Sequence, residues 1–306
     1  MHPAPSVIIF TTMSGLGYGL AAVLGLGLLD PSAVAVRAAH VLALMLIAGG
    51  LLASTRHLGN PQRAWRALSQ WRSSWLSREG VMALATFVPL TISAWMSVIE
   101  GRHVPLAGWI STAMCAATVY CTAMIYASLR SIQAWNTPLT PLCYLLFATA
   151  GGLLLATVVA FASGGPGSLL SVPALLAVVG AWVAKQAWWT RLRTLAPIST
   201  PETATGLGHI GRVRLFERPH VNENYLTREM GFKVARKHAV KLSKLAVLVG
   251  GALPVLLLLA ALLAGNGGLA IIAAVLAVLF YAVGLVTERW LFFAEARHAV
   301  MNYYGG

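Results

Sequence analysis

Long apolar runs alternate with short polar segments along most of this chain. A transmembrane helix needs about 20 predominantly apolar residues. Eight runs of about that length can be marked, at residues 6–28, 36–54, 80–99, 107–127, 140–162, 169–188, 245–264 and 269–287. The pattern predicts an all-α, polytopic integral membrane protein with eight transmembrane helices in a single membrane domain. Small residues within the runs, among them Gly15, Gly19, Gly151 and Gly152, favour close helix–helix packing.

Composition agrees with a membrane environment and excludes an ordinary soluble domain. Of 306 residues, 58% are hydrophobic and 10% are charged, whereas about a quarter of a soluble domain is charged. The net charge of +13 is compatible with nucleic-acid binding in principle. Its basic residues, however, lie mostly in loops that flank the apolar runs, as a membrane topology signal does. We therefore expect lipid, and no nucleic acid, around this chain.

The basic residues also predict an orientation. We call the side of the N-terminus the N-terminal face. It receives nineteen of the 22 Lys and Arg residues, in the loops after the second, fourth and sixth runs and in the tail, whereas the opposite face has only Arg37 and Arg102. Because Lys and Arg concentrate in cytoplasmic loops, both termini are predicted to be cytoplasmic. Tryptophans near the same face suggest an interfacial belt, formed by Trp65, Trp71, Trp75, Trp135, Trp182, Trp188, Trp189 and Trp290.

Two polar segments lie on the N-terminal face. The loop at 190–239 is too polar to enter lipid and too short to form a domain. We interpret it as a docking loop for a partner subunit, with disorder as the alternative. The segment at 288–306 is predicted to be an amphipathic tail that follows the last transmembrane helix along the same surface.

Several candidate sites can be set aside. The GLGHIG stretch at 206–211 matches a dinucleotide-binding pattern but follows no predicted strand, so we interpret its glycines as part of a turn. Only His40 of the eight histidines lies inside an apolar run, so no pair of axial haem ligands is evident. Cys115, Cys121 and Cys143 lack metal-site spacing and are expected to be buried thiols. We expect no haem, no metal site and no catalytic residue on this chain.

Lys185 is a charged residue inside the sixth marked run. It lies one turn from the end of the sixth run, between Trp182 and Trp188. We expect its ammonium group to extend to the interface while its stem stays in the apolar layer. The alternative is a functional side chain that lines a cavity.

The strongest candidate for a functional site is the arginine-rich stretch at 54–80. His57 follows the second run, and Arg63, Arg78 and Glu79 precede the third. A short connection would bring His57 and Glu79 together at the mouth of a groove between two helices. A quinone headgroup requires such an environment, with a hydrogen-bond donor for its oxygen, a carboxyl group that exchanges protons and apolar walls. Alternatively, His57 caps a helix, Glu79 pairs with an arginine and the arginines only set topology. The residue chemistry leaves both interpretations open.

Four stretches, at 6–20, 57–80, 206–239 and 288–298, resemble the membrane-anchor subunits of dimethyl-sulfoxide-reductase-type molybdoenzymes. The likeness covers essentially the whole sequence. It implies eight helices, no cofactor in the anchor and a quinone site beside a partner iron–sulfur subunit, which in turn contacts a molybdopterin catalytic subunit. The family's HLG…R motif and the acidic residue before its third helix are associated with quinol binding. They match His57, Gly59, Arg63 and Glu79.

Within that family the chain looks most like the membrane subunit of cytoplasm-facing sulfite dehydrogenases. The docking loop and the quinone segment both fall on the predicted cytoplasmic face, which favours sulfite oxidation with electrons passing to quinone at the bacterial inner membrane. The first alternative is a quinol-oxidising anchor of a dimethyl sulfoxide (S- or N-oxide) reductase. A secondary transporter is a second alternative, disfavoured because the middles of the runs carry no ionisable residue. The third is a structural anchor without a quinone site.

Overall fold

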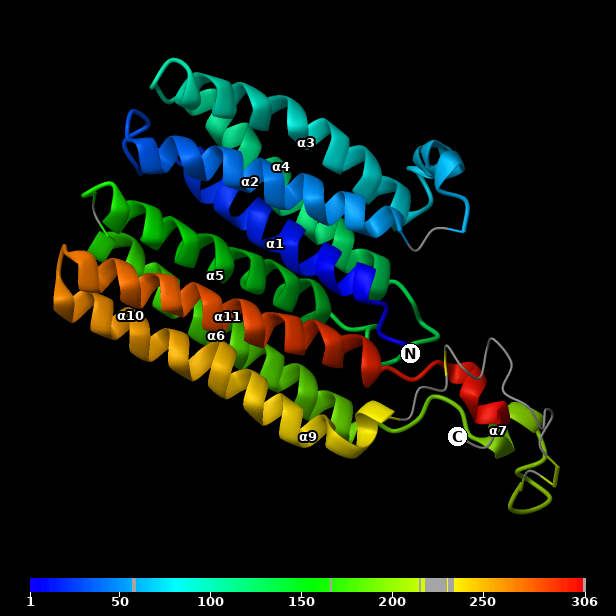
Figure 1. Ribbon diagram of the computed structural model, residues 1–306. Coiled ribbons are helices and arrows are strands. Elements are labelled where there is room, and N and C mark those ends of the chain that lie inside the picture. Colours follow the sequence, from blue (N-terminus) through cyan, green and yellow to red (C-terminus); the bar gives the residue numbers. More distant parts are fainter. Residues whose placement is uncertain (57–58, 166, 215, 218–229, 231–233, 305–306) are drawn as a thin grey trace.

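Eight long helices form one bundle in the computed structural model, which describes residues 1–304 apart from 57–58, 166, 215, 218–229 and 231–233 (Figure 1). For residues 61, 234–237 and 302–304 the backbone alone is described. The helices are α1 (Pro5–Gly25), α2 (Val34–Thr55), α3 (Trp75–Val98), α4 (Pro105–Ala127), α5 (Leu139–Ala162), α6 (Gly167–Thr194), the span formed by α9 (Val234–Val247), η2 (Leu248–Ala252) and α10 (Leu253–Ala264), and α11 (Gly268–Ala294). Among the described residues, eight helices are long and apolar enough to cross a membrane. The predicted all-α architecture with eight spans is confirmed for the described residues.

Helix α1 lies at the centre of the bundle. It packs against α2, α4 and α5, while α3 completes one side through α4. On the other side, α5 packs against α6 and α11, and α10 covers α11. The bundle therefore consists of two groups of four helices that meet mainly along α1 and α5 (Figure 1).

Two glycines bring α1 and α5 into backbone contact. A Cβ atom added to Gly19 would lie 1.9 Å from the carbonyl oxygen of Ala148, and one added to Gly152 would lie 2.1 Å from the carbonyl carbon of Gly19. Only a residue without a side chain fits at this crossing. The predicted packing through small residues is confirmed here, because helices in lipid associate through such close approach.

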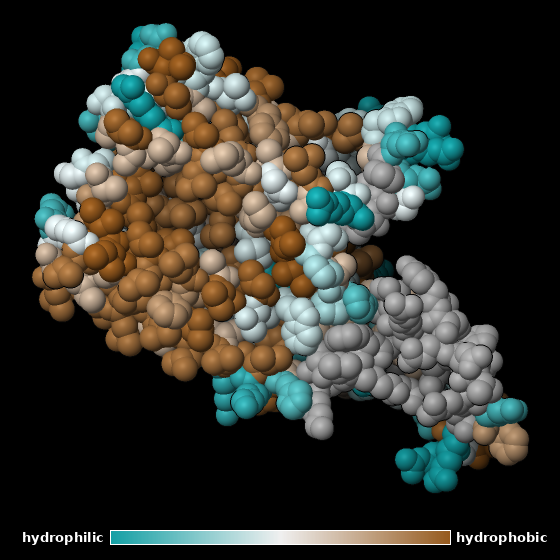
Figure 2. Space-filling view, in the orientation of Figure 1, coloured by the Kyte–Doolittle hydropathy of each residue, from teal (hydrophilic) through white to brown (hydrophobic). Residues whose placement is uncertain are grey.

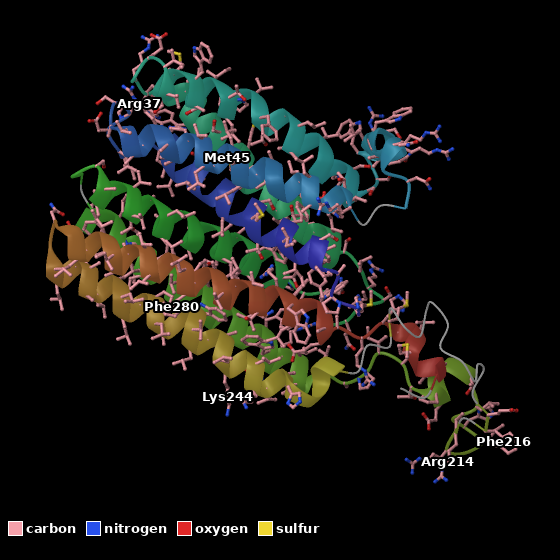
Figure 3. The ribbon with its side chains drawn as sticks, in the orientation of Figure 1. Arg37, Met45, Arg214, Phe216, Lys244 and Phe280 are labelled. Atoms are coloured by element: carbon pink, nitrogen blue, oxygen red, sulfur yellow. The ribbon has the colours of Figure 1, made fainter. Side chains whose placement is uncertain are left out.

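Most of the visible outer surface of the bundle is apolar, and polar residues gather toward its two ends (Figure 2). Met45 and Phe280, for example, point outward and are 58% and 37% exposed (Figure 3). Arg37 lies at one end, whereas Lys244 and Arg214 lie toward the other. The amino group of Met1 donates a 2.6 Å hydrogen bond to the carbonyl of Ala296, so the N-terminus adjoins the end of α11.

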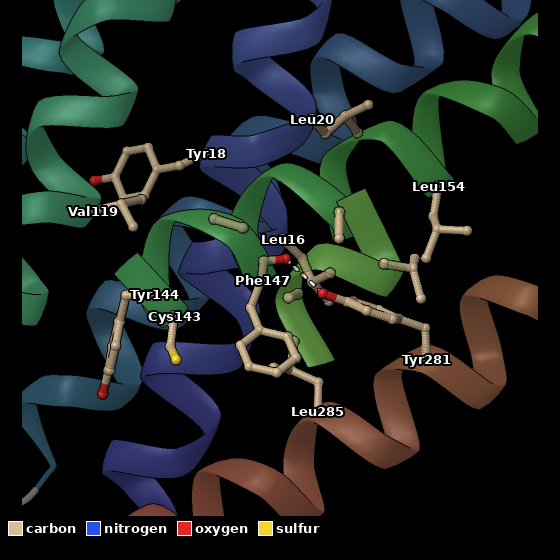
Figure 4. Packing of buried hydrophobic residues seen from close by; sticks show 14 of the residues in the cluster. Leu16, Tyr18, Leu20, Val119, Cys143, Tyr144, Phe147, Leu154, Tyr281 and Leu285 are labelled. Atoms are coloured by element: carbon tan, nitrogen blue, oxygen red, sulfur yellow. Dashed lines mark hydrogen bonds between the residues drawn. The ribbon is translucent and has the colours of Figure 1, made fainter. Parts of the chain in front are cut away.

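The interior of the bundle contains tryptophans that were predicted to lie at the lipid interface. Trp135, Trp182, Trp188 and Trp189 are each at most 5% exposed, so the predicted tryptophan belt is wrong for these four. Their indole rings pack against other side chains inside the bundle. Figure 4 shows a further aromatic contact, in which the Tyr281 hydroxyl donates a 2.6 Å hydrogen bond to the carbonyl of Phe147.

Two helix boundaries differ from the sequence prediction in ways that affect the site. Helix α3 begins at Trp75, so Glu79 lies within its second turn instead of ahead of it. Helix α11 continues through Ala294, so the predicted surface tail at 288–306 starts later than expected. Glu288 and Arg289 are buried in the bundle, because α11 continues past the end of the predicted apolar run and keeps both residues packed against its neighbours.

Candidate functional site

A short 3₁₀ helix, η1 (Pro61–Gln70), connects α2 to α3 at the N-terminal face. The Ser77 hydroxyl of α3 donates a hydrogen bond to the carbonyl of Ala67, which holds η1 against the start of α3. Gly59 and Arg63 are exposed on this connection. His57 lies outside the described residues, so its expected approach to Glu79 stays a prediction.

Arg78 supports the turn that follows η1. Its Nε donates to the carbonyl of Trp71 at 3.0 Å, and its Nη2 donates to the carbonyl of Arg72 at 2.8 Å. The guanidinium group also lies 4.3 Å from the centre of the Trp75 ring, a distance at which a cation is attracted to an aromatic face. Through these contacts Arg78 stabilises the turn that precedes α3, next to Glu79.

Glu79 is buried between α3 and α4, with 6% exposure. Its Oε1 accepts a 2.5 Å hydrogen bond from the Thr122 hydroxyl of α4. Thr86 and Thr118 form a second link between the same helices at 3.0 Å. In the part of the sequence that the structure describes, no Lys, Arg or His forms an ion pair with Glu79. A carboxyl group with so few partners inside a helix bundle is suited to hold and release a proton.

A second polar cluster, which we call the α6–α11 charge cluster, consists of Lys185, Glu288 and Arg289. The Lys185 ammonium lies 2.6 Å from Glu288 Oε1, and Arg289 donates to Glu288 Oε2. All three side chains are at most 3% exposed. The expectation that Lys185 extends to the interface is therefore wrong.

Aromatic rings hold this cluster inside the bundle. The Lys185 ammonium lies 3.7 Å from the centre of the Trp188 ring and 5.2 Å from that of Phe292. The Arg289 guanidinium lies 4.0 Å from the centre of the Tyr144 ring. Cation–aromatic attraction and the internal carboxylate together replace the water that these cations lose on burial.

Sequence reasoning missed Glu288 and Arg289 as interior residues. The predicted apolar run ends at 287, and both charges fall within the predicted surface tail. The available signal was the strongly apolar stretch WLFF immediately after them, at 290–293, which is buried apart from its tryptophan. Glu79, Lys185, Glu288 and Arg289 all lie nearer to the N-terminal face than the middle of their helices, so the middles of the spans carry no Lys, Arg, Asp or Glu, as expected.

A small cavity of about 20 Å³ lies between the two polar sites. Thr122, the partner of Glu79, contributes to its wall, and so does Arg289 of the charge cluster. Its remaining lining residues are Thr11, Ser14, Gly15, Val119, Tyr144, Phe147, Ala148 and Leu285. A polar space of this size holds about one water molecule. The cavity lies within the bundle near the N-terminal face, because Thr122 is close to the end of α4 and Tyr144 close to the start of α5.

The fold and these sites define a class: a multi-pass membrane protein in whose described residues the buried Lys, Arg and Glu side chains gather near one end of an eight-helix bundle. Comparison with known families identifies the class further. Residues 1–294 match the family described as "DMSO reductase anchor subunit (DmsC)". The chain belongs to this family, as its resemblance in sequence predicted. It is therefore a membrane anchor subunit of a multi-subunit reductase family, which implies partner subunits.

Individual relatives support the same assignment. The protein is 34% identical to a sulfite dehydrogenase subunit of Allochromatium vinosum, over 99% of both sequences. It is 35% identical to an anaerobic dimethyl sulfoxide reductase subunit of Haemophilus influenzae, over 37% of its own length and 41% of the relative. It is 27% identical to the YnfH protein of anaerobic dimethyl sulfoxide reductase from Escherichia coli, over 44% of its own length and 50% of the relative. Similarity along the full length is thus seen with the sulfite dehydrogenase protein.

Proposed function

We propose that this chain is the quinone-reactive membrane anchor of a molybdopterin oxidoreductase, and that it links a partner iron–sulfur subunit to the quinone pool. In this proposal the iron–sulfur clusters and the molybdopterin reside in two partner subunits, and quinone is a bound substrate of the anchor. Family membership supports the anchoring role. Likeness to a sulfite dehydrogenase subunit over 99% of the sequence favours sulfite as the electron donor.

The observation that carries the quinone assignment is the buried carboxyl group of Glu79. It lies in the second turn of α3, at the end of the arginine-rich stretch, and has Thr122 as its hydrogen-bond partner. Quinone reduction consumes two protons for every two electrons, so a proton-exchanging group is required close to the headgroup. We assign that task to Glu79.

The other motif residues have complementary roles in the proposal. His57 donates a hydrogen bond to a quinone oxygen, and Arg63 stabilises negative charge on the reduced headgroup. Gly59 belongs to the same motif and leaves open space, because a Cβ atom added there meets no atom within 4 Å. Arg78 maintains the turn beside Glu79 through its bonds to two carbonyl groups.

The proposed reaction is sulfite + water + quinone → sulfate + quinol. Two electrons leave sulfur at the molybdenum centre of the partner and pass through the iron–sulfur clusters to quinone, which also takes up two protons. We place the partners on the N-terminal face, where the loop at 190–239 and most of the basic residues lie. By the positive-inside rule this face is cytoplasmic.

The purified three-subunit complex provides the test. Sulfite-dependent reduction of a short-chain quinone should fall at least tenfold in His57→Ala and Glu79→Gln, while reduction of an artificial dye by the catalytic subunit stays unchanged. Glu100→Gln is the matched control, because Glu100 is an exposed carboxylate at the opposite face. Unchanged quinone reduction in both site variants, with normal assembly, would refute the site assignment.

The dimethyl sulfoxide reductase proteins among the relatives favour a second candidate, in which the same site oxidises quinol. The same preparation separates the two. Quinol oxidation coupled to reduction of an S- or N-oxide, with no sulfite activity, would assign the complex to this branch and reverse the electron flow. The anchoring role would be the same in both cases.

A further inference from the structure

Two buried polar sites border the same small cavity, one through Thr122, the partner of Glu79, and the other through Arg289. Glu79 is 6% exposed and has no ion-pair partner among the described residues. The α6–α11 charge cluster combines two cations with one carboxylate, so its formal charge is +1. The buried carboxyl group of Glu79 therefore has no compensating positive charge, whereas the buried α6–α11 charge cluster has one positive charge in excess.

The excess charge is directed toward the small cavity. Among the described residues, Arg289 Nη2 and the Tyr144 hydroxyl are buried polar atoms that make no hydrogen bond of ordinary length and angle, although the two groups interact with each other. Both residues line the cavity, together with Thr122. Buried donors without partners are rare in native structures and call for a ligand or a water molecule. The cavity volume of about 20 Å³ suits one water molecule.

We propose that this cavity is an internal water site, and that its water joins Arg289 to the Glu79–Thr122 pair as a water-mediated charge pair. Arg289 is then a positioning residue for proton exchange, and Lys185 and Glu288 fix its place. The inference rests on the proposed function, because it concerns the proton that Glu79 passes to quinone.

The chemistry explains why the bundle needs such a charge. When Glu79 gives its proton to a quinone oxygen, it becomes a carboxylate in a place where an unpaired charge is unfavourable. The nearby positive charge of Arg289 stabilises this form, and a bridging water carries the interaction at little loss compared with a direct hydrogen bond. A proton from water then restores the carboxyl group for the next transfer.

Other titratable groups surround Glu79 and must be considered in any pH experiment. Those on its own or adjacent elements include Arg78 of α3, Tyr18 of α1, Arg56 at the end of α2, Arg63 and Arg66 of η1, Cys121 and Tyr126 of α4, and Tyr144 of α5. The tyrosines and the cysteine are uncharged near neutral pH by their ordinary values. The arginines of η1 are exposed and screened by solvent.

Charge variants of the cluster test the electrostatic part of the proposal in the purified complex. We measure sulfite-dependent quinone reduction against pH and take the midpoint of its alkaline limb. Arg289→Gln removes a positive charge, so ionising Glu79 becomes harder and the midpoint should rise by about one pH unit. Glu288→Gln raises the formal charge of the cluster to +2, so the midpoint should fall. Arg289→Lys keeps the charge and should stay close to wild type.

Opposite shifts from two neighbouring substitutions cannot result from general loss of structure. In a Glu79→Gln background the residual activity should show neither shift, since the responding group is gone. If Glu79→Gln abolishes quinone reduction but Arg289→Gln and Glu288→Gln leave the midpoint in place, the charge pair is refuted and the proposed function survives. If Glu79→Gln has no effect, the proposed function itself fails.

The water site has its own test. Gly15 lines the cavity, and a Cβ atom added there meets no atom within 4 Å. Gly15→Ala therefore takes space from the cavity without a clash and favours the helix. We expect a severalfold lower rate at neutral pH in a protein that is at least as stable as wild type. Gly180→Ala is the matched control, since its Cβ atom also meets nothing within 4 Å and it is absent from the cavity lining.

Tyr144→Phe completes the design. Because its hydroxyl makes no protein hydrogen bond of ordinary length and angle in the described structure, a purely structural role predicts little change in rate and no change in isotope effect on removal of this oxygen. The water site predicts a lower rate and a larger solvent isotope effect on quinone reduction. Wild-type rates and isotope effects in both Gly15→Ala and Tyr144→Phe would overturn the assignment of the cavity.

Discussion

Lys185 of α6 and Glu288 of α11 form a 2.6 Å ion pair between two side chains that are at most 1% exposed. The pair joins two membrane-spanning helices that are far apart in the sequence. Arg289 shares the same carboxylate. Inside a bundle, each partner of such a pair depends on the other, because an isolated buried charge is strongly unfavourable.

Lys185→Met should therefore destabilise the protein. It removes the ammonium from Glu288 and from the face of Trp188. Because Arg289 still pairs with Glu288, the loss should be that of one hydrogen bond to a charged group, about 1.5–3 kcal/mol. The unfolding temperature of the detergent-solubilised protein measures the effect. Lys244→Met is the matched control on an exposed lysine, where we expect a change within about 0.5 kcal/mol. Equal unfolding temperatures for the two variants would contradict a stabilising pair.

Glu295 gives stability a pH dependence at the end of α11. Burial raises the pKa of this carboxyl group, although Trp189 Nε1 donates a 2.8 Å hydrogen bond to its Oε2. A raised pKa in the folded protein means that folding favours the protonated form. This contribution is complete below the ordinary pKa of glutamate and is lost as the pH rises through the raised value.

Glu295→Gln should accordingly stabilise the protein at neutral pH. Glutamine keeps an oxygen that accepts the Trp189 hydrogen bond and removes the buried negative charge. The gain in unfolding temperature over wild type should be largest near pH 7 and should shrink toward pH 4. A gain that grows on acidification would show that the sign of the pKa shift is wrong.

Gly19→Ala should disrupt the crossing of α1 and α5. The added methyl group would lie 1.9 Å from the carbonyl oxygen of Ala148, so the helices must separate, and overpacking of this kind costs about 1–3 kcal/mol. Protease resistance of the solubilised protein and its yield in membranes measure the loss. Gly180→Ala makes no close contact and should be neutral or slightly stabilising. Equal protease resistance in the two variants would argue against backbone contact at Gly19.

The sequence was sufficient to predict the number of helices and the family. Long apolar runs determine spanning helices almost independently of tertiary structure, because the lipid imposes a fixed length. Close helix packing through glycines, such as that at the α1–α5 crossing, could be predicted, since small residues are common at helix interfaces. Which helix each glycine meets required the structure.

The charge cluster and the cavity could not be predicted from the sequence. Hydropathy locates a helix but does not tell which of its faces points inward, so Lys185 was expected at the interface and Trp188 in an aromatic belt. Lys185 is buried opposite Glu288 of α11, and Trp188 packs against the Lys185 ammonium and against Phe292 of α11. The cavity is formed by residues of α1, α4, α5 and α11, and a space between four helices has no signature in any one of them.

Thr122→Val tests the environment of Glu79 without changing its charge. Valine keeps the shape of threonine and removes the hydroxyl that donates the 2.5 Å hydrogen bond to Glu79. A hydrogen bond to a charged group contributes about 1.5–3 kcal/mol, so the ionised form of Glu79 loses stabilisation when it has released its proton. We expect the rate of quinone reduction to fall about tenfold, with unchanged dye reduction.

Thr157→Val is the control for this substitution. Thr157 is equally buried in α5, but its hydroxyl donates only to the carbonyl of Leu153 in its own helix. Its replacement should leave quinone reduction within about twofold of wild type, since such an intrahelical bond leaves helix geometry nearly unchanged. Equal losses in the two variants would mean that the bundle responds to any lost hydroxyl. A loss confined to Thr122→Val would tie the rate to the hydrogen bond on Glu79, because that bond is what distinguishes the two threonines.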